Sequence, residues 1–401
     1  MRYLILIICV AGLGLLIQQG PLPVADSASY VGLLMVLCYL GGKLFRFLGL
    51  PVVVSYIGMG VTARGLGILP GNIFTMGDPF IAMALGWVGF HAGFEIGKMR
   101  NTLKPAHVCL FLLGSIVPFV LVTVILKSIT GFPSVVVLTL ALAASLPAPI
   151  LAFVTADRIP ESVLLTAVCG GFSLLLFARL AGYWGGTLPF ILGVGASLAV
   201  AVLWAETLAR AQASLKEDWS LISLVLIMLV LFQWTSVLLK HSLLLTALAA
   251  GALVSMHSVS VPRFERILGP VGAGAGALLL GGFGMQIAVE RLAELPLEIW
   301  GVAAVYLGSM IGGKLIGGAL VSKAAHPYGR LAGIALIPQD LLLLEIDAQV
   351  SHRAELFGES ADLIHAVLII AALVGGLALP FLDFVLQRSV LASRETREQE
   401  T

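Results

Sequence analysis

Residues 311–318 read Ile-Gly-Gly-Lys-Leu-Ile-Gly-Gly and lie within an apolar run from Trp300 to Val321. This run is long enough to cross a bilayer, because a spanning helix needs about 20 mostly apolar residues. A charge in the middle of such a helix costs roughly 2.5–3.5 kcal/mol on insertion scales, so it is rarely kept without a use. The glycines on both sides let neighbouring backbones come close. Lys314 is therefore the first candidate for a functional residue.

The composition of the whole chain indicates a membrane protein. Of its 401 residues, 59% are hydrophobic and 11% charged, and the mean hydropathy is +1.05. A soluble domain averages about 25% charged residues. The formal charge of +1 and the lack of a basic tract argue against binding of nucleic acid. The cysteines have no CxxC spacing and fit packing roles, so we expect neither a metal site nor a cofactor.

The apolar runs predict an all-α polytopic protein with about 13–14 transmembrane helices. The expected spans are 3–20, 28–48, 51–70, 79–97, 106–128, 134–155, 162–180, 186–209, 219–237, 242–257, 265–288, 298–322, 329–350 and 362–387. With both termini cytoplasmic, roughly sixteen Lys and Arg residues face inward and roughly five outward, which is the bias that the positive-inside rule requires. We therefore expect a multi-pass protein of the cell (inner or plasma) membrane.

Two of these spans contain proline in their middle third. The sixth holds Pro147 and Pro149, and the thirteenth holds Pro338 followed by Gln339 and Asp340. Proline removes a backbone donor and clashes with the preceding turn, so each helix is expected to break or kink. Two interrupted helices seven spans apart are typical of an inverted-repeat transporter core. Ordinary proline kinks are the alternative, and the carboxylate of Asp340 favours the transporter interpretation.

Five stretches, taken in order, resemble the monovalent cation/proton antiporter superfamily, in the branch of bacterial sodium/proton antiporters and potassium-efflux proteins. The similarity runs from about residue 29 to residue 387. Residues 313–318 resemble the family's "GKllgg", whose lysine lies in the ion-binding core, and residues 337–340 take the place of its "aPRGE". The other three stretches are 42–54 with the glycines up to Gly67, 85–96, and 283–287. The resemblance implies an inverted-repeat antiporter fold with two broken crossing helices.

One departure from the family concerns its aspartates. In the family, the helix after the first broken one carries one or two aspartates that bind the cation and the proton. Gly170 and Gly171 stand at those positions here, and no Asp or Glu lies between Glu161 and Glu206. The arginine and glutamate of "PRGE" are likewise replaced by Gln339 and Asp340. The ordinary exchange mechanism of the family thus lacks its titratable carboxylate on this helix.

The resemblance divides the chain into three parts. Residues 1–27 form an extra N-terminal transmembrane helix, which we expect to be retained because no good small-x-small cleavage site follows it. Residues 28–387 form the antiporter-like transmembrane domain, and residues 388–401 form a short charged cytoplasmic tail. The family architecture also implies a homodimer.

The resulting hypothesis is a secondary-active transporter that exchanges sodium or potassium for protons at an atypical site centred on Lys314. The expected transport core consists of Lys314, Asp340, Gln339, Pro338, Ser145, Pro147, Pro149, Gly170 and Gly171. Two alternatives stay open: a degenerate, non-transporting scaffold or sensor subunit, and a transporter of an anionic or neutral solute on the same fold. An enzyme is not expected, because the histidines are scattered and form no HExxH motif.

Glu95 and His91 are four residues apart on one face of the fourth span. They form a possible gate. Since Glu95 lies close to Lys98, a surface ion pair is an equally good interpretation. Ser145 has a structural alternative too, because a serine in a helix can donate a hydrogen bond back to its own backbone.

Overall fold

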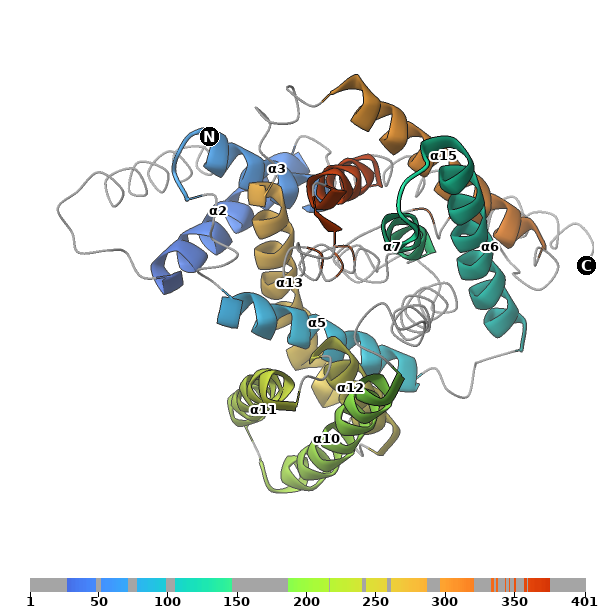
Figure 1. The fold of residues 1–401 in the computed structure, drawn as a ribbon. Helices are drawn as coiled ribbons and strands as arrows, with labels where there is room; N and C mark the ends of the chain where they lie inside the picture. Colours follow the sequence, from blue (N-terminus) through green and yellow to red (C-terminus); the bar gives the residue numbers. More distant parts are fainter. Residues whose placement is uncertain are drawn as a thin grey trace, which may run out of the picture. The chain divides into compact units, whose positions relative to one another are not determined.

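The computed structural model describes residues 27–47, 52–70, 78–98, 105–145, 187–215, 217–239, 243–257, 261–286, 296–320 and 360–375, with isolated positions between 333 and 358. Every regular element in these ranges is helical (Figure 1). The predicted spans 3–20 and 162–180, both proline-interrupted stretches and the C-terminal tail lie outside the described residues.

The described helices follow the predicted spans closely. They are α2 (Ser27–Phe47), α3 (Val52–Gly65), α5 (Asp78–Lys98), α6 (Pro105–Thr130), α7 (Ser134–Ser145), α10 (Thr187–Ser214), α11 (Asp218–Leu239), α12 (Leu243–His257), α13 (Val261–Gln286) and α15 (Leu297–Leu320), followed by a helix at 360–375. Among the described residues, seven helices are long and apolar enough to cross a membrane. This agrees with an all-α polytopic membrane protein, in which helices satisfy their own backbone hydrogen bonds.

α3 is shorter than the span predicted for 51–70. It ends at Gly65, and the chain turns through Gly67, whose φ is +67°. The amide of Gly67 donates to the carbonyl of Arg64 at 2.8 Å, and the amide of Ile68 donates to the carbonyl of Ala63 at 2.9 Å. These two bonds form a Schellman motif, which closes a helix with a glycine in the left-handed region. Sequence hydropathy could not show this end because the residues that follow it are also apolar.

The chain forms two compact units. Unit 1 comprises Met1–Asn101 and Leu188–Glu290, and unit 2 comprises Thr102–Thr187 and Arg291–Thr401. Each unit therefore combines one segment from the first half of the chain with one from the second half. This division is expected where two halves of a sequence interlock, and each unit is considered separately below.

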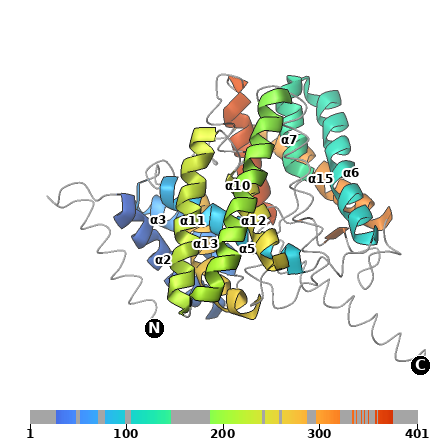
Figure 2. The same ribbon diagram turned by 90° about the horizontal axis from the view of Figure 1, so that it is seen from below.

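Unit 1 contains two helix triplets. The first triplet is α2, α3 and α13, which pack on one another, and the second is α11, α12 and α5, which also pack on one another (Figure 1). In the predicted order of spans, α2, α3 and α5 are the second, third and fourth, and α11, α12 and α13 the ninth, tenth and eleventh. Each triplet member thus has a counterpart seven spans away in the other triplet. α10 lies beside α11 (Figure 2), with the Trp204 and Phe232 rings 6.3 Å apart.

Glycines hold α5 tightly against α12 in the second triplet. A Cβ at Gly93 would overlap the carbonyl oxygen of Leu248, so only glycine fits. Three successive contacts pair Gly89 with Leu244, Gly93 with Leu248 and Gly97 with Ala252. From one contact to the next, the residue number increases by four on both helices. The two helices therefore run parallel, as the fourth and tenth spans of the predicted order must. Small residues at four-residue spacing are the usual means of close helix approach in membranes.

Glycines also bring helices of the first triplet into close contact. A Cβ at Gly60 of α3 would overlap the carbonyl oxygen of Gly281 on α13, and a Cβ at Gly284 would overlap the carbonyl oxygen of Ile57. The α3–α13 contact and the α12–α5 contact are counterparts under the shift of seven spans. Glycine allows the backbones to approach closely at both places.

Unit 2 is built around α6, α7 and α15, with α15 packed mainly on α6. From one contact to the next, the residue number rises on α15 and falls on α6, so the two helices run antiparallel. Gly313 meets Pro118, and Gly317 meets Leu113 and Gly114. α6 continues as a helix through Pro118, although the proline supplies no N–H to the carbonyl of Gly114.

Candidate transport site around Lys314

Lys314 lies on the buried face of α15 and has 0% of its surface exposed. It shares this face with Tyr306, Met310, Gly313 and Gly317. The next two residues of the helix, Leu315 and Ile316, are exposed, as expected where a helix meets lipid. The side chain therefore does not reach solvent, as a lysine that extends toward a membrane interface would.

Three glycines bring other backbones against the turn that carries Lys314. A Cβ at Gly313 would overlap Pro118, and a Cβ at Gly317 would lie 2.5 Å from the carbonyl oxygen of Leu113. On another side, a Cβ at Gly333 would overlap the carbonyl oxygen of Lys314 itself. Lys314 also takes part in an interaction with another group of the molecule. These contacts fix the backbone of the turn that carries Lys314.

Ser145 is the last residue of α7 and is fully buried. Its hydroxyl donates to the carbonyl oxygen of Leu142 at 2.5 Å, which is the local bond that the sequence offered as the structural alternative. The remaining predicted core residues, namely Pro147, Pro149, Gly170, Gly171, Pro338, Gln339 and Asp340, lie outside the described residues. The sequence predictions for them stay predictions.

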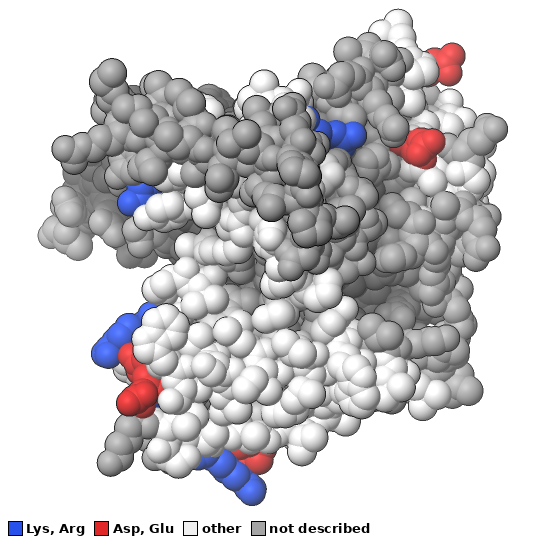
Figure 3. All heavy atoms as spheres, turned by 90° about the vertical axis from the view of Figure 1, so that its left-hand side faces the viewer, with Lys and Arg blue, Asp and Glu red and all other residues white. Residues whose placement is uncertain are grey.

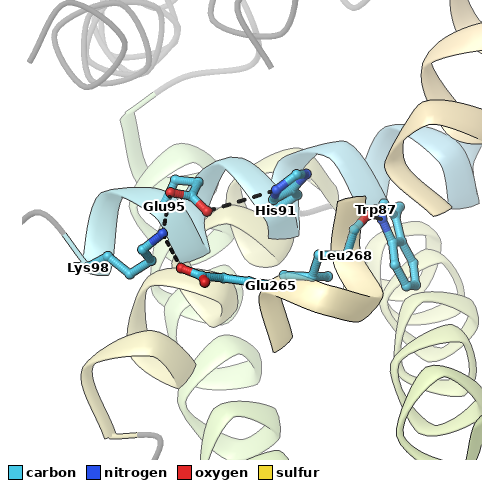
Figure 4. Close-up of polar contacts among 6 residues, drawn as sticks. All are labelled: Trp87, His91, Glu95, Lys98, Glu265 and Leu268. Atoms are coloured by element: carbon cyan, nitrogen blue, oxygen red, sulfur yellow. Dashed lines mark hydrogen bonds and ion pairs between the residues drawn. The ribbon is translucent and has the colours of Figure 1, made fainter. Parts of the chain in front are cut away.

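The possible gate on α5 is part of a larger charged cluster within unit 1 (Figure 4). Lys98 pairs with Glu95 at 2.9 Å and also with Glu265 of α13. His91 Nε2 lies 4.0 Å from Glu95 Oε1. The predicted ion pair between neighbours on one helix is therefore present, and a carboxylate from a distant helix joins it.

Two contacts between α5 and α13 could not be predicted from the sequence. Glu265 lies well over a hundred residues from Lys98, and nothing in the local pattern of either helix pairs them. The indole Nε1 of Trp87 donates to the carbonyl oxygen of Leu268 at 3.3 Å, again between α5 and α13. Side chains from both helices face one another along this contact (Figure 4).

A third non-local contact closes the other end of α13. Arg64, in the last turn of α3, donates from Nη1 to the carbonyl oxygens of Met285 at 2.7 Å and Gln286 at 3.1 Å. These are the last two residues of α13, whose carbonyls have no partner within their own helix. A cation at this end also balances the negative end of the helix dipole. Nothing in the local sequence around Arg64 predicts this contact.

Charged side chains are sparse on the described surface that Figure 3 shows, where most atoms belong to uncharged residues. Apolar side chains that face outward include Val202 and Leu203 of α10 and Trp234 of α11. Within the described residues, no group of three His, Cys, Asp or Glu side chains is placed to hold a metal ion. The described surface thus suits contact with lipid.

No protein-family model matches the chain, and no curated protein matches it. Its fold, however, matches that of solved sodium/proton antiporters. The structure of the sodium proton antiporter MjNhaP1 from Methanocaldococcus jannaschii at pH 8 superposes with a TM-score of 0.69 at 15% identity, over 90% of this chain and 98% of that one. An electron-microscopy structure of the same antiporter gives a TM-score of 0.66 at 16% identity, over 91% and 96%.

The fold defines the class of protein: an all-helical, multi-pass membrane protein with the architecture of a sodium/proton antiporter. The expectation drawn from the five sequence stretches is confirmed at the level of the fold. At 15–16% identity the likeness carries the fold alone. The solute and the mechanism must be argued from this chain's own residues.

Proposed function

We propose that the protein is a secondary-active transporter of the cation/proton antiporter type, which exchanges sodium or potassium for protons at a site centred on Lys314. The observation that carries the proposal is a lysine with 0% exposure, on a turn held by backbone contacts, in an antiporter fold. A charge buried in a transmembrane helix is expensive and usually marks an ion pathway.

Lys314 would hold the proton in one half of the cycle and release it in the other. An amine can exist in charged or neutral form, and burial penalises the charged form, so arrival of a solute can be linked to loss of the proton. Asp340 would supply the carboxylate that Gly170 and Gly171 do not, and Ser145 would line the site. These roles rest on the sequence, because only Lys314 and Ser145 lie within the described residues.

The glycines that stand in place of the family's aspartates also favour a different kind of solute. With glycines at 170 and 171, the site loses one or two negative charges and keeps its lysine, a combination that suits an anionic or neutral solute. The other alternative is a non-transporting scaffold or sensor subunit on the same fold. The homodimer implied by the resemblance is part of the proposal in each case.

The test is flux in proteoliposomes that contain the full-length protein. Under an imposed pH gradient we expect proton movement coupled to sodium or potassium, and loss of that movement in Lys314→Met. Lys43→Met is the matched control, since Lys43 is an exposed lysine near the end of α2. Equal flux in wild type and Lys314→Met would remove Lys314 from the mechanism. Flux of an anion instead of a cation would favour the second solute class, and no flux of any ion would favour the scaffold.

A further inference from the structure

The two triplets of unit 1 meet mainly where α13 packs on α5, with a smaller contact between α13 and α11. Of the described helices in the first triplet, α13 alone packs on the second triplet by more than isolated contacts. In the part of the chain that the structure describes, α2 and α3 make at most isolated contacts with the second triplet. The relative placement of the two triplets therefore depends on where α13 is held and on how stiff it is.

The N-terminal part of α13 is fastened to the second triplet. Glu265 pairs with Lys98, and the carbonyl of Leu268 accepts the bond from the indole of Trp87 (Figure 4). Arg263 donates from Nε to Asp218 of α11 at 2.8 Å. The charged members of this contact are thus Glu95, Lys98 and Glu265, with Arg263 and Asp218 beside them.

The C-terminal part of α13 is fastened to the first triplet. Gly281 and Gly284 allow contact with Cys38 of α2 and Ile57 of α3, where a Cβ would overlap both neighbours. Arg64 of α3 caps the last carbonyls of the helix. One helix is therefore fixed to two different bodies at its two ends.

The middle of α13 is built to bend. Pro270 supplies no N–H to the carbonyl of Arg266, which removes one hydrogen bond from the helix. A Cβ at Gly269 would meet nothing within 4 Å, and a Cβ at Gly274 would meet only Met35 at an ordinary 3.5 Å. Packing therefore does not require glycine at either position. Glycine costs a helix interior about 1 kcal/mol relative to alanine, so both residues soften the helix with no compensating contact.

We propose that residues 269–274 form a hinge between the two triplets, and that the Glu95–Lys98–Glu265 cluster is a latch that holds the hinge in the observed geometry. Opening the latch loosens the N-terminal part of α13, which stays on α5 through the Trp87–Leu268 bond and the Phe94–Phe264 ring contact, and the helix then bends more readily at Gly269 and Pro270. The first triplet moves with the C-terminal part, because its glycine contacts and the Arg64 cap stay intact. His91 contributes bulk at the hinge, since its Nδ1 lies 3.2 Å from the Cβ position of Gly272.

Hydrogen exchange of the full-length protein in nanodiscs tests the coupling between latch and hinge. Lys98→Met removes both ion pairs of the latch and is expected to speed exchange of amides 266–276 about fivefold, with little change in amides 281–286. Arg210→Met is the matched control, because it breaks an exposed ion pair with Glu206 on α10. The control should leave α13 unchanged.

The second part of the experiment replaces the hinge glycines with alanine, which stiffens the helix. Gly269→Ala combined with Gly274→Ala is expected to slow exchange at 266–276 and to abolish the response to Lys98→Met. Gly195→Ala, at a helical glycine in open space on α10, should leave that response intact. A response that survives in the alanine variant, or faster exchange spread evenly over α5, α12 and α13, would overturn the proposal. If Lys98→Met does not fold, Glu265→Gln must give the same local response, and an unchanged rate there equally overturns it. Neither readout depends on transport.

Discussion

Gly313 of α15 lies directly against the backbone of Pro118 in α6, one residue before the buried Lys314. The contact brings two antiparallel helices together where one lacks a side chain and the other lacks an N–H. A Cβ at position 313 has no space, because the atoms it would meet belong to backbone and a rigid ring. The placement of Lys314 within unit 2 is therefore set by a packing contact next to it.

Gly313→Ala is expected to destabilise the protein by about 1–3 kcal/mol, the usual cost of forcing atoms into a filled interior. Gly312→Ala is the matched control on the same helix, since a Cβ there meets nothing within 4 Å. The control should be neutral or stabilising by up to about 1 kcal/mol through helix propensity. Thermal unfolding in detergent measures both. Similar effects from the two substitutions would show that α6 and α15 are not in close contact at this point.

Gly93→Ala is expected to separate α5 from α12 and to cost about 1–3 kcal/mol, because the new methyl group overlaps the Leu248 carbonyl oxygen. Gly195→Ala on α10 is the control, at a helical glycine with open space around it. Unfolding by denaturant in detergent gives the difference. An unaffected Gly93→Ala protein would contradict the parallel, glycine-mediated packing of the second triplet.

Arg64→Met is expected to cost about 1.5–3 kcal/mol, the range for hydrogen bonds that involve a charged group. The substitution leaves the last carbonyls of α13 without their donor, so exchange at amides 281–286 should rise. Arg210→Met breaks only an exposed pair within α10 and should cost about 0–1 kcal/mol. If exchange at the end of α13 stays at the wild-type rate, Arg64 is not its cap.

Ser145→Ala is expected to change stability by less than about 0.5 kcal/mol and to keep coupled flux near that of the wild type. The hydroxyl donates to the carbonyl of Leu142 in its own helix, and such a local side-chain bond adds little to helix stability. Flux in proteoliposomes and thermal unfolding are the two measurements. A large loss of flux with normal stability would show that the hydroxyl oxygen contacts the solute.

Much of the helical content was predictable because a bilayer leaves the chain few choices. Backbone groups in hydrocarbon must be paired within the segment, so long apolar runs become helices, and α5 and α15 fall within a residue or two of their predicted bounds. The end of α3 was missed, since its closure depends on the left-handed φ of Gly67 and not on hydropathy. Lys314 stood out as a charge within an apolar, glycine-rich run, and the structure places it fully buried, while its role in transport stays a prediction.

The sequence by itself determined the membrane class, the positions of most helices, the conspicuous lysine and the local pair of Glu95 with Lys98, because each depends on residues within one or two helical turns. Only the tertiary structure decided which helices meet. The pairing of Lys98 with Glu265, the Arg64 cap on α13 and the contact of Gly313 with Pro118 all join segments far apart in the chain. The contact of Gly313 with Pro118 depends on the space that a glycine leaves between two backbones, and all three contacts exist only once the helices have packed.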